Sequence, residues 1–446
     1  MFSLPEEAKV GLLTLSIAFT EPTFHRMLGL LVGMLLLRGR RSVNGALWQM
    51  QGLLPGHPSS YHRLLSRARW ALWPLARLVA GWAIRLAERM GPSEGILVAV
   101  DDTVVRAKGR RVYGKGRHRD PLRSTHRHMV WRWGHRWVVL AVLVRFAWAQ
   151  RSWALPVLVA LYRPKQEGWR RHKTPTDLAR GLMAVLIRWF PEKTFIFLAD
   201  GGFSSYELAW FCRRRQAVLV GRFWANACLH EQPHAYQGRG RPRLKGPRRP
   251  SPQQVVAQST LCSCQVLWHG ETARRVQLCS QKAFWYKPRY GLTPIRWVFA
   301  RDPNGRFRDF YLFCTKPQWR PQTILSFYTT RWAIETTFQQ TRAQLGLETT
   351  RGWRRQTVLR TGPCLLGLFT LVCVIYQEYW ERHPTQPPSP RPGYPKHTLS
   401  FSDVLAAVRK LFWEQSILAH PYWQPLAEKI PPEYKSLLLD QLCFSP

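Results

Sequence analysis

The sequence predicts an α/β fold in which helices flank a mixed sheet. Two apolar, β-branched runs, 95–105 and 194–199, read as buried strands that end on or contain acidic residues. An amphipathic helical pattern over 174–190 lies between them, and further strand-like runs follow the second acid. With 446 residues and 46% apolar content, the chain is long enough to bury a large core.

The chain is strongly basic along its whole length. Lys and Arg number 66 against 26 Asp and Glu, which gives a formal net charge of +40. This excess predicts a polyanionic partner, nucleic acid above all, bound with an affinity that falls as salt rises. A ribosome-associated or membrane-surface protein is the alternative, although 22 Trp and 14 Tyr do not fit a simple charged tail.

The compartment is predicted from cysteine usage and from hydropathy. Nine cysteines without a CxxC pair indicate reduced thiols in a cytosolic protein. No signal peptide is evident, and the apolar stretch 363–376 is too short to span a membrane, so it suits a buried helix. We therefore expect a cytoplasmic protein without a membrane partner.

Residues 1–90 are predicted to be helical, with Ser42 as the N-cap of a short helix. Short basic helices ahead of a core suit the recognition of DNA, for example in helix-turn-helix style, and a scaffold with a solvated basic face explains them equally well. Basic side chains in this region include Arg63, Arg67, Arg69 and Arg77.

The first acidic motif is Asp101-Asp102-Thr103, inside the apolar strand 95–105. An unpaired buried charge is costly, which favours a metal-binding or catalytic role over chance. The structural alternative is a strand end that already meets solvent. Because neighbouring side chains on a strand face opposite sides, only one of the two aspartates is expected to point into a site.

The second motif follows the strand 194–199, where Asp200 is succeeded by two glycines and Phe203. Glycines permit a tight turn, which places the carboxylate at the C-terminal edge of the sheet. Ser204 is expected to cap the next helix, which runs to about residue 215. Between the two motifs we expect antiparallel strands at 136–146 and 153–162, then the 174–190 helix capped by Thr174 or Thr176.

The region 223–310 is predicted to be a β-rich insertion. It contains a Gly/Pro/Arg-rich loop and several strand-like runs. Trp285 and Arg289 are candidates to stack an unpaired base and grip a DNA backbone, and a small β core with solvated arginines is the alternative. The letters of the zinc-protease motif HExxH occur at 230–234, but Pro233 is incompatible with the required helix.

The third motif is the stretch 328–342, read as one helix. Residue spacings of 3, 4 and 7 place four polar side chains on one stripe: Tyr328, Arg331, Glu335 and Arg342. An apolar stripe beside it can pack on a sheet. As an isolated feature this is a surface ion-pair ladder. Arg351 follows in a basic turn that we expect to face DNA, before a buried helix at 362–379.

Together these motifs resemble the DDE transposases of the insertion-sequence type that carry a Tyr-Arg-Glu-Lys signature. Tyr328, Arg331 and Glu335 match that signature, whereas Arg342 replaces its lysine, which keeps the charge but substitutes a planar fork for a point donor. Asp200, with the Gly and the aromatic residue that follow it, matches the second motif of the group.

The resemblance covers about residues 95–370 and implies an RNase H-like core with a β-strand insertion before the glutamate. It implies Asp101, Asp200 and Glu335 as catalytic metal ligands, with Asp102 as the alternative to Asp101. The domain arrangement that follows is a helical DNA-end-binding region (1–90), the first part of the core (91–222), the insertion (223–310), the second part of the core (311–380) and a Pro-rich linker with C-terminal helices (381–446).

The implied activity is cleavage at transposon ends and joining of 3′ ends to target DNA. It would use Mg²⁺ or Mn²⁺, as two ions, because carboxylate oxygens suit hard cations. Tyr328, Arg331 and Arg342 would hold phosphates beside the scissile bond. The implied partners are double-stranded transposon-end and target DNA and a second copy of the chain, in the nucleoid of a prokaryote. The rivals are an RNase H-like DNA-binding protein without catalysis and a structural RNA-binding protein.

Overall fold

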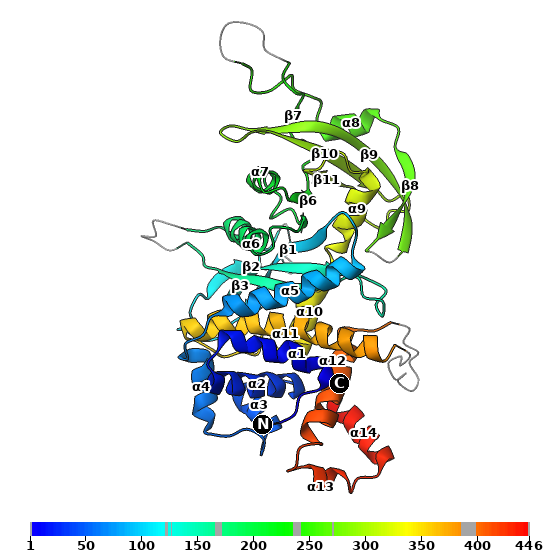
Figure 1. The fold of residues 1–446 in the computed structure, drawn as a ribbon. Helices are drawn as coiled ribbons and strands as arrows, with labels where there is room; N and C mark the ends of the chain where they lie inside the picture. Colours follow the sequence, from blue (N-terminus) through cyan, green and yellow to red (C-terminus); the bar gives the residue numbers. More distant parts are fainter. Residues whose placement is uncertain are drawn as a thin grey trace.

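The computed structural model describes residues 2–120, 124–125, 127–165, 172–234, 242–269, 272–384 and 398–444. An 11-stranded mixed sheet runs through it with helices on both faces, as the predicted α/β class requires (Figure 1). The N-terminal and C-terminal helices lie together at one end of the molecule, and the strands after β6 lie at the other (Figure 1). Most of the predicted linker, residues 385–397, lies outside the described residues.

The centre of the sheet has the strand order β4-β3-β1-β5-β6. β1 pairs antiparallel with β3 and parallel with β5, and β5 pairs parallel with β6. This is the arrangement expected of an RNase H-like core, and it confirms the antiparallel strands predicted at 136–146 and 153–162. The bounds are β1 Ile96–Arg106, β2 Gly116–Arg119, β3 Trp131–Val144, β4 Trp153–Tyr162, β5 Phe195–Ala199 and β6 Val218–Arg222.

The predicted insertion extends this sheet instead of forming a separate one. β11 pairs antiparallel with β6, and β10 and β9 continue outward from it. One of the strand-like runs of the predicted insertion, 274–279, is part of the much longer β9, which pairs with β10 along 11 positions. The bounds are β7 Leu229–His230, α8 Pro252–Gln258, β8 Cys262–Trp268, β9 Thr272–Lys287, β10 Gly291–Arg301 and β11 Phe310–Cys314.

One face of the sheet is covered by helices from both ends of the chain. Val98 and Val100 of β1 share one buried cluster with side chains from these helices. The longer helices that contribute most of its side chains are α1 Glu6–Thr14, α2 Glu21–Leu36, α5 Leu72–Met90, α6 Pro175–Trp189, α7 Tyr206–Arg214, α11 Arg355–Arg382 and α12 Phe401–Phe412. The remaining short helices are η1 Leu15–Ala18, α3 Val43–Gln49, α4 Pro58–Ser66, the π-helix Trp413–Ile417, α13 Gln424–Ala427 and α14 Pro432–Cys443.

The helix caps agree with the sequence at two of three positions. Ser42 accepts from the Gly45 backbone, and Thr174 forms a capping box with Asp177 at the start of α6. The predicted cap at Ser204 is wrong. Ser205 caps α7, because the Ser204 hydroxyl donates instead to the Asp200 carbonyl at 2.7 Å.

The opposite face of the sheet is covered by α9 (Pro321–Thr330) and α10 (Ala333–Leu345). Leu97 and Ala99 of β1 and Ile196 and Leu198 of β5 pack in one cluster with apolar side chains from both helices. α10 ends at Gly346, whose φ of 66° is the left-handed conformation that favours glycine at a helix C-terminus.

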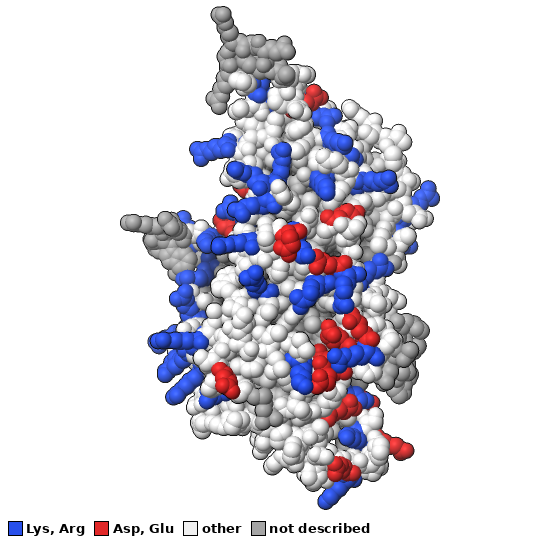
Figure 2. All heavy atoms as spheres, viewed as in Figure 1, with Lys and Arg blue, Asp and Glu red and all other residues white. Residues whose placement is uncertain are grey.

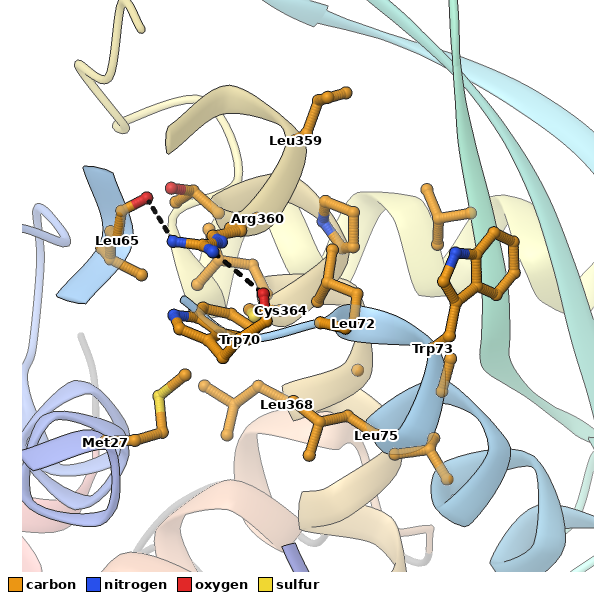
Figure 3. A pocket seen from close by; sticks show the side chains of 18 of the residues that line it. Met27, Leu65, Trp70, Leu72, Trp73, Leu75, Leu359, Arg360, Cys364 and Leu368 are labelled. Carbon is orange, nitrogen blue, oxygen red and sulfur yellow. Dashed lines mark hydrogen bonds between the residues drawn. The ribbon is translucent and has the colours of Figure 1, made fainter. Parts of the chain in front are cut away.

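α11 is the one described helix with the length and hydropathy to cross a membrane, but 67% of its most apolar window is buried. This agrees with the predicted buried helix. Beside α11, an apolar cleft of about 1130 Å³ opens between α2, α5 and β4 (Figure 3). Its described lining contains no Asp or Glu, so it is separate from the acidic motifs.

Candidate active site

Asp101 and Asp200 lie side by side at the edge of the central sheet. β1 and β5 run parallel, and their last matched pair is Val100 with Ala199, so each aspartate directly follows that pair: Asp200 comes after the end of β5, whereas Asp101 lies within β1, which continues to Arg106 beside β3. Asp101 follows the alternation of Leu97 and Ala99, whose face is covered by α9 and α10. The two carboxylates that are far apart in the sequence are therefore brought to one edge, as predicted.

Asp200 is held by the turn that follows it. Its Oδ1 accepts from the backbone N–H of Gly202 at 3.0 Å and of Phe203 at 3.2 Å. Burial raises the pKa of Asp200, whereas the positive charge of Arg331 and the two backbone donors lower it. Neither glycine of the turn has a left-handed backbone conformation. The position of the carboxylate is therefore fixed by the two backbone N–H donors.

Asp101 is the more deeply buried of the two carboxylates. Its Oδ1 accepts from the backbone N–H of Asp102 at 2.8 Å, and its Oδ2 accepts from Nη1 of Arg331 at 2.8 Å. Burial raises the pKa of Asp101 to about 7, and the negative charges of Asp200 and Asp102 add to that shift while Arg331 opposes it. A further cation placed beside this carboxylate would stabilise its ionised form and lower its pKa.

Asp102 is paired with an arginine of β3. Arg136 forms a salt bridge with its Oδ2 and also donates from Nη2 to its Oδ1 at 3.1 Å. The Arg136 guanidinium lies 5.7 Å from the centre of the Tyr162 ring. The negative charge of Asp102 still raises the pKa of Asp200, so both members of the acidic pair lie within electrostatic reach of the site. Sequence reasoning missed Arg136, although a cation inside an apolar strand was a usable signal.

The third motif is divided between two helices, so the prediction of one continuous helix is wrong. Backbone N–H groups of Arg331, Ile334 and Glu335 donate to carbonyls three residues earlier, at 3.0 to 3.2 Å. This 3₁₀-type bonding tightens the turn between α9 and α10. Tyr328 therefore lies on α9, and Glu335 lies in the first turn of α10.

Arg331 lies between the acids of the first and third motifs. Its Nη1 bonds to Asp101, and its Nη2 donates to Oε1 of Glu335 at 2.9 Å. The arginine and Asp101 side chains are only 12% and 13% exposed, whereas Glu335 is 47% exposed. The structure thus connects Glu335 to Asp101 through one guanidinium, and Glu335 reaches outward from the sheet edge.

Two other predicted phosphate ligands lie nearby. Tyr328 is buried, and the guanidinium groups of Arg222 and Arg331 each lie 5.9 Å from the centre of its ring. Burial raises the pKa of the Tyr328 phenol. Arg342 donates to the Thr103 hydroxyl on β1 and lies 3.6 Å from Glu348. These contacts place Tyr328 and Arg342 at opposite ends of the α9–α10 segment along the sheet edge.

The other predicted DNA-binding residues lie away from this group. Arg351 is exposed between α10 and α11, and Arg289 is exposed in the β9–β10 turn. The Trp285 ring lies 5.0 to 5.7 Å from the rings of Tyr206, Phe223, Trp224 and Phe313. Trp285 therefore packs within an aromatic cluster of the extended sheet, and its role toward DNA stays a prediction.

The predicted metal site has only part of its donor set in place. Within the described ranges, no group of three or more His, Cys, Asp or Glu side chains is close enough together to hold a metal ion. The donor type fits, because Asp101 and Asp200 offer carboxylate oxygens at one sheet edge, but Arg331 occupies the space through which Glu335 would join them. The HExxH letters do not form a helix, since His230 ends β7 and residues 231–234 are irregular.

Comparison with known proteins places the chain in a family. The structure is similar to that of a piggyBac transposase in its synaptic complex with hairpin DNA, with 13% identity, a TM-score of 0.43 and coverage of 98% of this chain and 82% of that chain. No curated protein sequence matches the chain. The family described as DDE superfamily endonuclease matches residues 14–278, more than half of the chain, which includes Asp101 and Asp200 and stops before Glu335. The chain therefore belongs to the DDE superfamily endonuclease family.

Proposed function

We propose that this endonuclease is an insertion-sequence transposase that cleaves DNA at transposon ends and transfers the 3′ ends to target DNA. The observation that supports the proposal most strongly is the meeting of three motifs at one sheet edge. Asp101 and Asp200 directly follow the last matched pair of two adjacent parallel strands, and Arg331 links Asp101 to Glu335. Membership of the endonuclease family supports cleavage as the reaction class.

Asp101, Asp200 and Glu335 are the residues that would hold Mg²⁺ or Mn²⁺, with Asp102 as the alternative to Asp101. When bound, a pair of such ions supplies an activated water or 3′-hydroxyl and stabilises the leaving oxygen of the phosphodiester. The chain's own contribution is a buried acidic edge: burial raises the pKa of Asp101 to about 7 even beside Arg331, and a further cation at the carboxylate lowers that pKa.

In the protein without DNA, Arg331 supplies the positive charge that pairs with Asp101 and Glu335. A DNA phosphate beside the sheet edge competes with the Asp101 and Glu335 carboxylates for this guanidinium, because Arg binds phosphate and carboxylate through the same fork. Transfer of Arg331 to phosphate frees both acids together. Tyr328 and Arg342 are proposed to hold further phosphates along the same edge, and Trp285, Arg289 and Arg351 to contact DNA farther out.

The proposed partners are double-stranded transposon ends, target DNA and a second copy of the chain on paired ends, in the cytoplasm of a prokaryote. The charge distribution supports a DNA partner. Lys and Arg are spread over the viewed face, across the insertion strands and the core alike, whereas acidic side chains gather in fewer places (Figure 2). A net charge of +40 gives such a surface a long-range attraction for phosphate.

The test is a nicking assay on a DNA fragment that carries the inverted repeats flanking the reading frame. The proposal predicts cuts at the repeat ends with Mg²⁺ or Mn²⁺ and none with EDTA. Binding without cleavage under all metal conditions would favour the alternative, a catalytically inactive RNase H-like DNA-binding protein. Binding of RNA without preference for the repeats would favour a structural RNA-binding protein.

A further inference from the structure

A ribbon of two strands carries exposed aromatic and basic side chains beyond the acidic edge. β2 and β3 pair antiparallel, with Arg117 opposite Trp133 and Arg119 opposite Trp131. These four residues are exposed, whereas Gly116 and His118 on the other side of β2 are buried. The indoles are 45% exposed at Trp131 and 58% exposed at Trp133. Paired exposed tryptophans on a regular strand are unusual and indicate a binding surface.

Each indole of the ribbon has a cation beside it. The Arg117 guanidinium lies 5.2 Å from the centre of the Trp131 ring, and Nζ of Lys115 lies 5.1 Å from that of Trp133. Cation–π contacts of this kind orient a ring and a positive charge toward the same space. We call Lys115, Arg117, Arg119, Trp131 and Trp133 the ribbon surface.

The strand register relates the ribbon surface to the acids. Asp101 pairs with Val139 of β3, and the odd-numbered residues Trp137 and Val139 pack on the same face as Asp101. Trp133 continues that alternation and lies six residues from Val139 along β3. At ~3.4 Å per residue in an antiparallel strand, this is roughly 20 Å from the acids. A base-paired DNA strand leading from the acids to the ribbon spans that distance in about six nucleotides, at ~3.4 Å each.

Among the described residues, few unpaired acidic side chains lie near the exposed cations of the ribbon. Asp120, which follows β2, forms an ion pair with Arg132 at 2.7 Å, between the two indoles in sequence. Glu348, another acid near the edge, is placed 3.6 Å from Arg342. The nearby acids are thus matched by arginines, which leaves Lys115, Arg117 and Arg119 as a net positive surface beside two open rings.

We propose that the ribbon surface binds an unpaired segment of DNA about six nucleotides from the scissile phosphate. The indoles stack on its bases, and the three cations contact its phosphates. Stacking needs the face of a base, which an unpaired strand offers and a duplex covers, since the grooves of a duplex present only base edges. The inference deepens the proposed function, on which its position relative to a scissile phosphate rests.

The test is fluorescence-anisotropy binding of a labelled 12-nucleotide single strand and its duplex to the full chain, in EDTA so that no cleavage occurs. Stacking contributes ~1–3 kcal/mol per base, so losing both stacks in Trp131→Ala/Trp133→Ala should weaken single-strand binding by roughly 30-fold or more. Duplex binding should change by less than about threefold. Trp131→Phe/Trp133→Phe should recover most of the affinity, because the phenyl ring keeps a stacking face.

A second variant tests the cations separately. Arg117→Gln/Arg119→Gln should lower the salt dependence of single-strand binding by about 1.4 in log–log slope, at ~0.7 for each arginine that no longer neutralises a phosphate. The alanine variant of the tryptophans should leave that slope unchanged. Tyr434→Ala is the matched control, because Tyr434 is a 64% exposed aromatic side chain on α14, far along the chain from the ribbon. All of these side chains are exposed, so the variants should fold with unchanged melting temperatures.

Unchanged single-strand binding by the double alanine variant would overturn the inference. An equal loss for single strand and duplex would also overturn it and assign the ribbon to duplex DNA. Loss of self-association with intact DNA binding would assign it to a protein partner instead. Because the measurement needs no cleavage, a chain that binds single strands through the ribbon but never cuts would contradict the proposed function alone.

Discussion

The guanidinium of Arg331 donates to Asp101 at 2.8 Å and to Glu335 at 2.9 Å, so one arginine joins acids that are 234 positions apart in the chain. Its Nε is buried and makes no hydrogen bond within the described residues. The arginine therefore balances the charge of the acidic edge while one donor stays unused.

Removing Arg331 should destabilise the protein. Arg331→Gln leaves the buried Asp101 carboxylate without its main counter-charge, which should cost roughly 2–4 kcal/mol in the free energy of unfolding at pH 8. Urea denaturation of the metal-free protein measures this. Asp101→Asn combined with Arg331→Gln should be more stable than the sum of the two single variants implies, since the buried charge is then gone. Strict additivity would contradict the pairing.

His118 should make the protein sensitive to acid. Burial, with Arg136 nearby, lowers the pKa of His118 to about 4, whereas an unfolded histidine titrates near 6.5. The unfolded chain binds more protons between those values, so stability is present above pH 6.5 and is lost as pH falls toward 4, by at most ~3 kcal/mol. His118→Gln should flatten this dependence in urea titrations from pH 4 to 7. The exposed His62, changed to Gln, is the control and should leave the dependence as it is.

Arg360 should be irreplaceable by lysine. Its guanidinium donates to the carbonyls of Leu64, Leu65, Ala68 and Trp70, and two of these bonds are drawn in Figure 3. A lysine ammonium cannot satisfy four carbonyls arranged for a planar fork, so Arg360→Lys should cost roughly 2 kcal/mol or more. Thermal unfolding measures the effect, with the exposed Arg355→Lys on the same helix as control. Equal melting temperatures for the two variants would show that the fork is not required.

The central part of the fold could be predicted because its signals are local. The run that ends at Ala199 is apolar throughout, and a turn follows at once, so the position of Asp200 at a sheet edge follows from the sequence. The alternation of Leu97, Ala99 and Asp101 similarly decides which face Asp101 shares. These arguments need only the periodicity of a strand.

Other features depend on contacts between distant segments. No Gly or Pro marks the break between α9 and α10, where tight backbone bonding accompanies the Arg331 contact with Asp101. The pairing of β11 with β6 makes the insertion an extension of the core sheet. No local sequence pattern predicts this pairing, because it joins segments that are far apart in the chain. Trp285 reads as an exposed stacking residue in sequence, but four aromatic rings surround it.

The most direct measurement is cleavage of a labelled transposon-end fragment by Asp200→Asn and Glu335→Gln, with Glu433→Gln as control. Glu433 is an exposed acid in the first turn of α14, among the C-terminal helices and outside the acidic edge. Both site variants should lose cleavage by at least about 1000-fold, as expected when a group needed in the transition state is removed, and should still bind the ends. Cleavage at the wild-type rate by either variant, or equal loss in the control, would contradict the account.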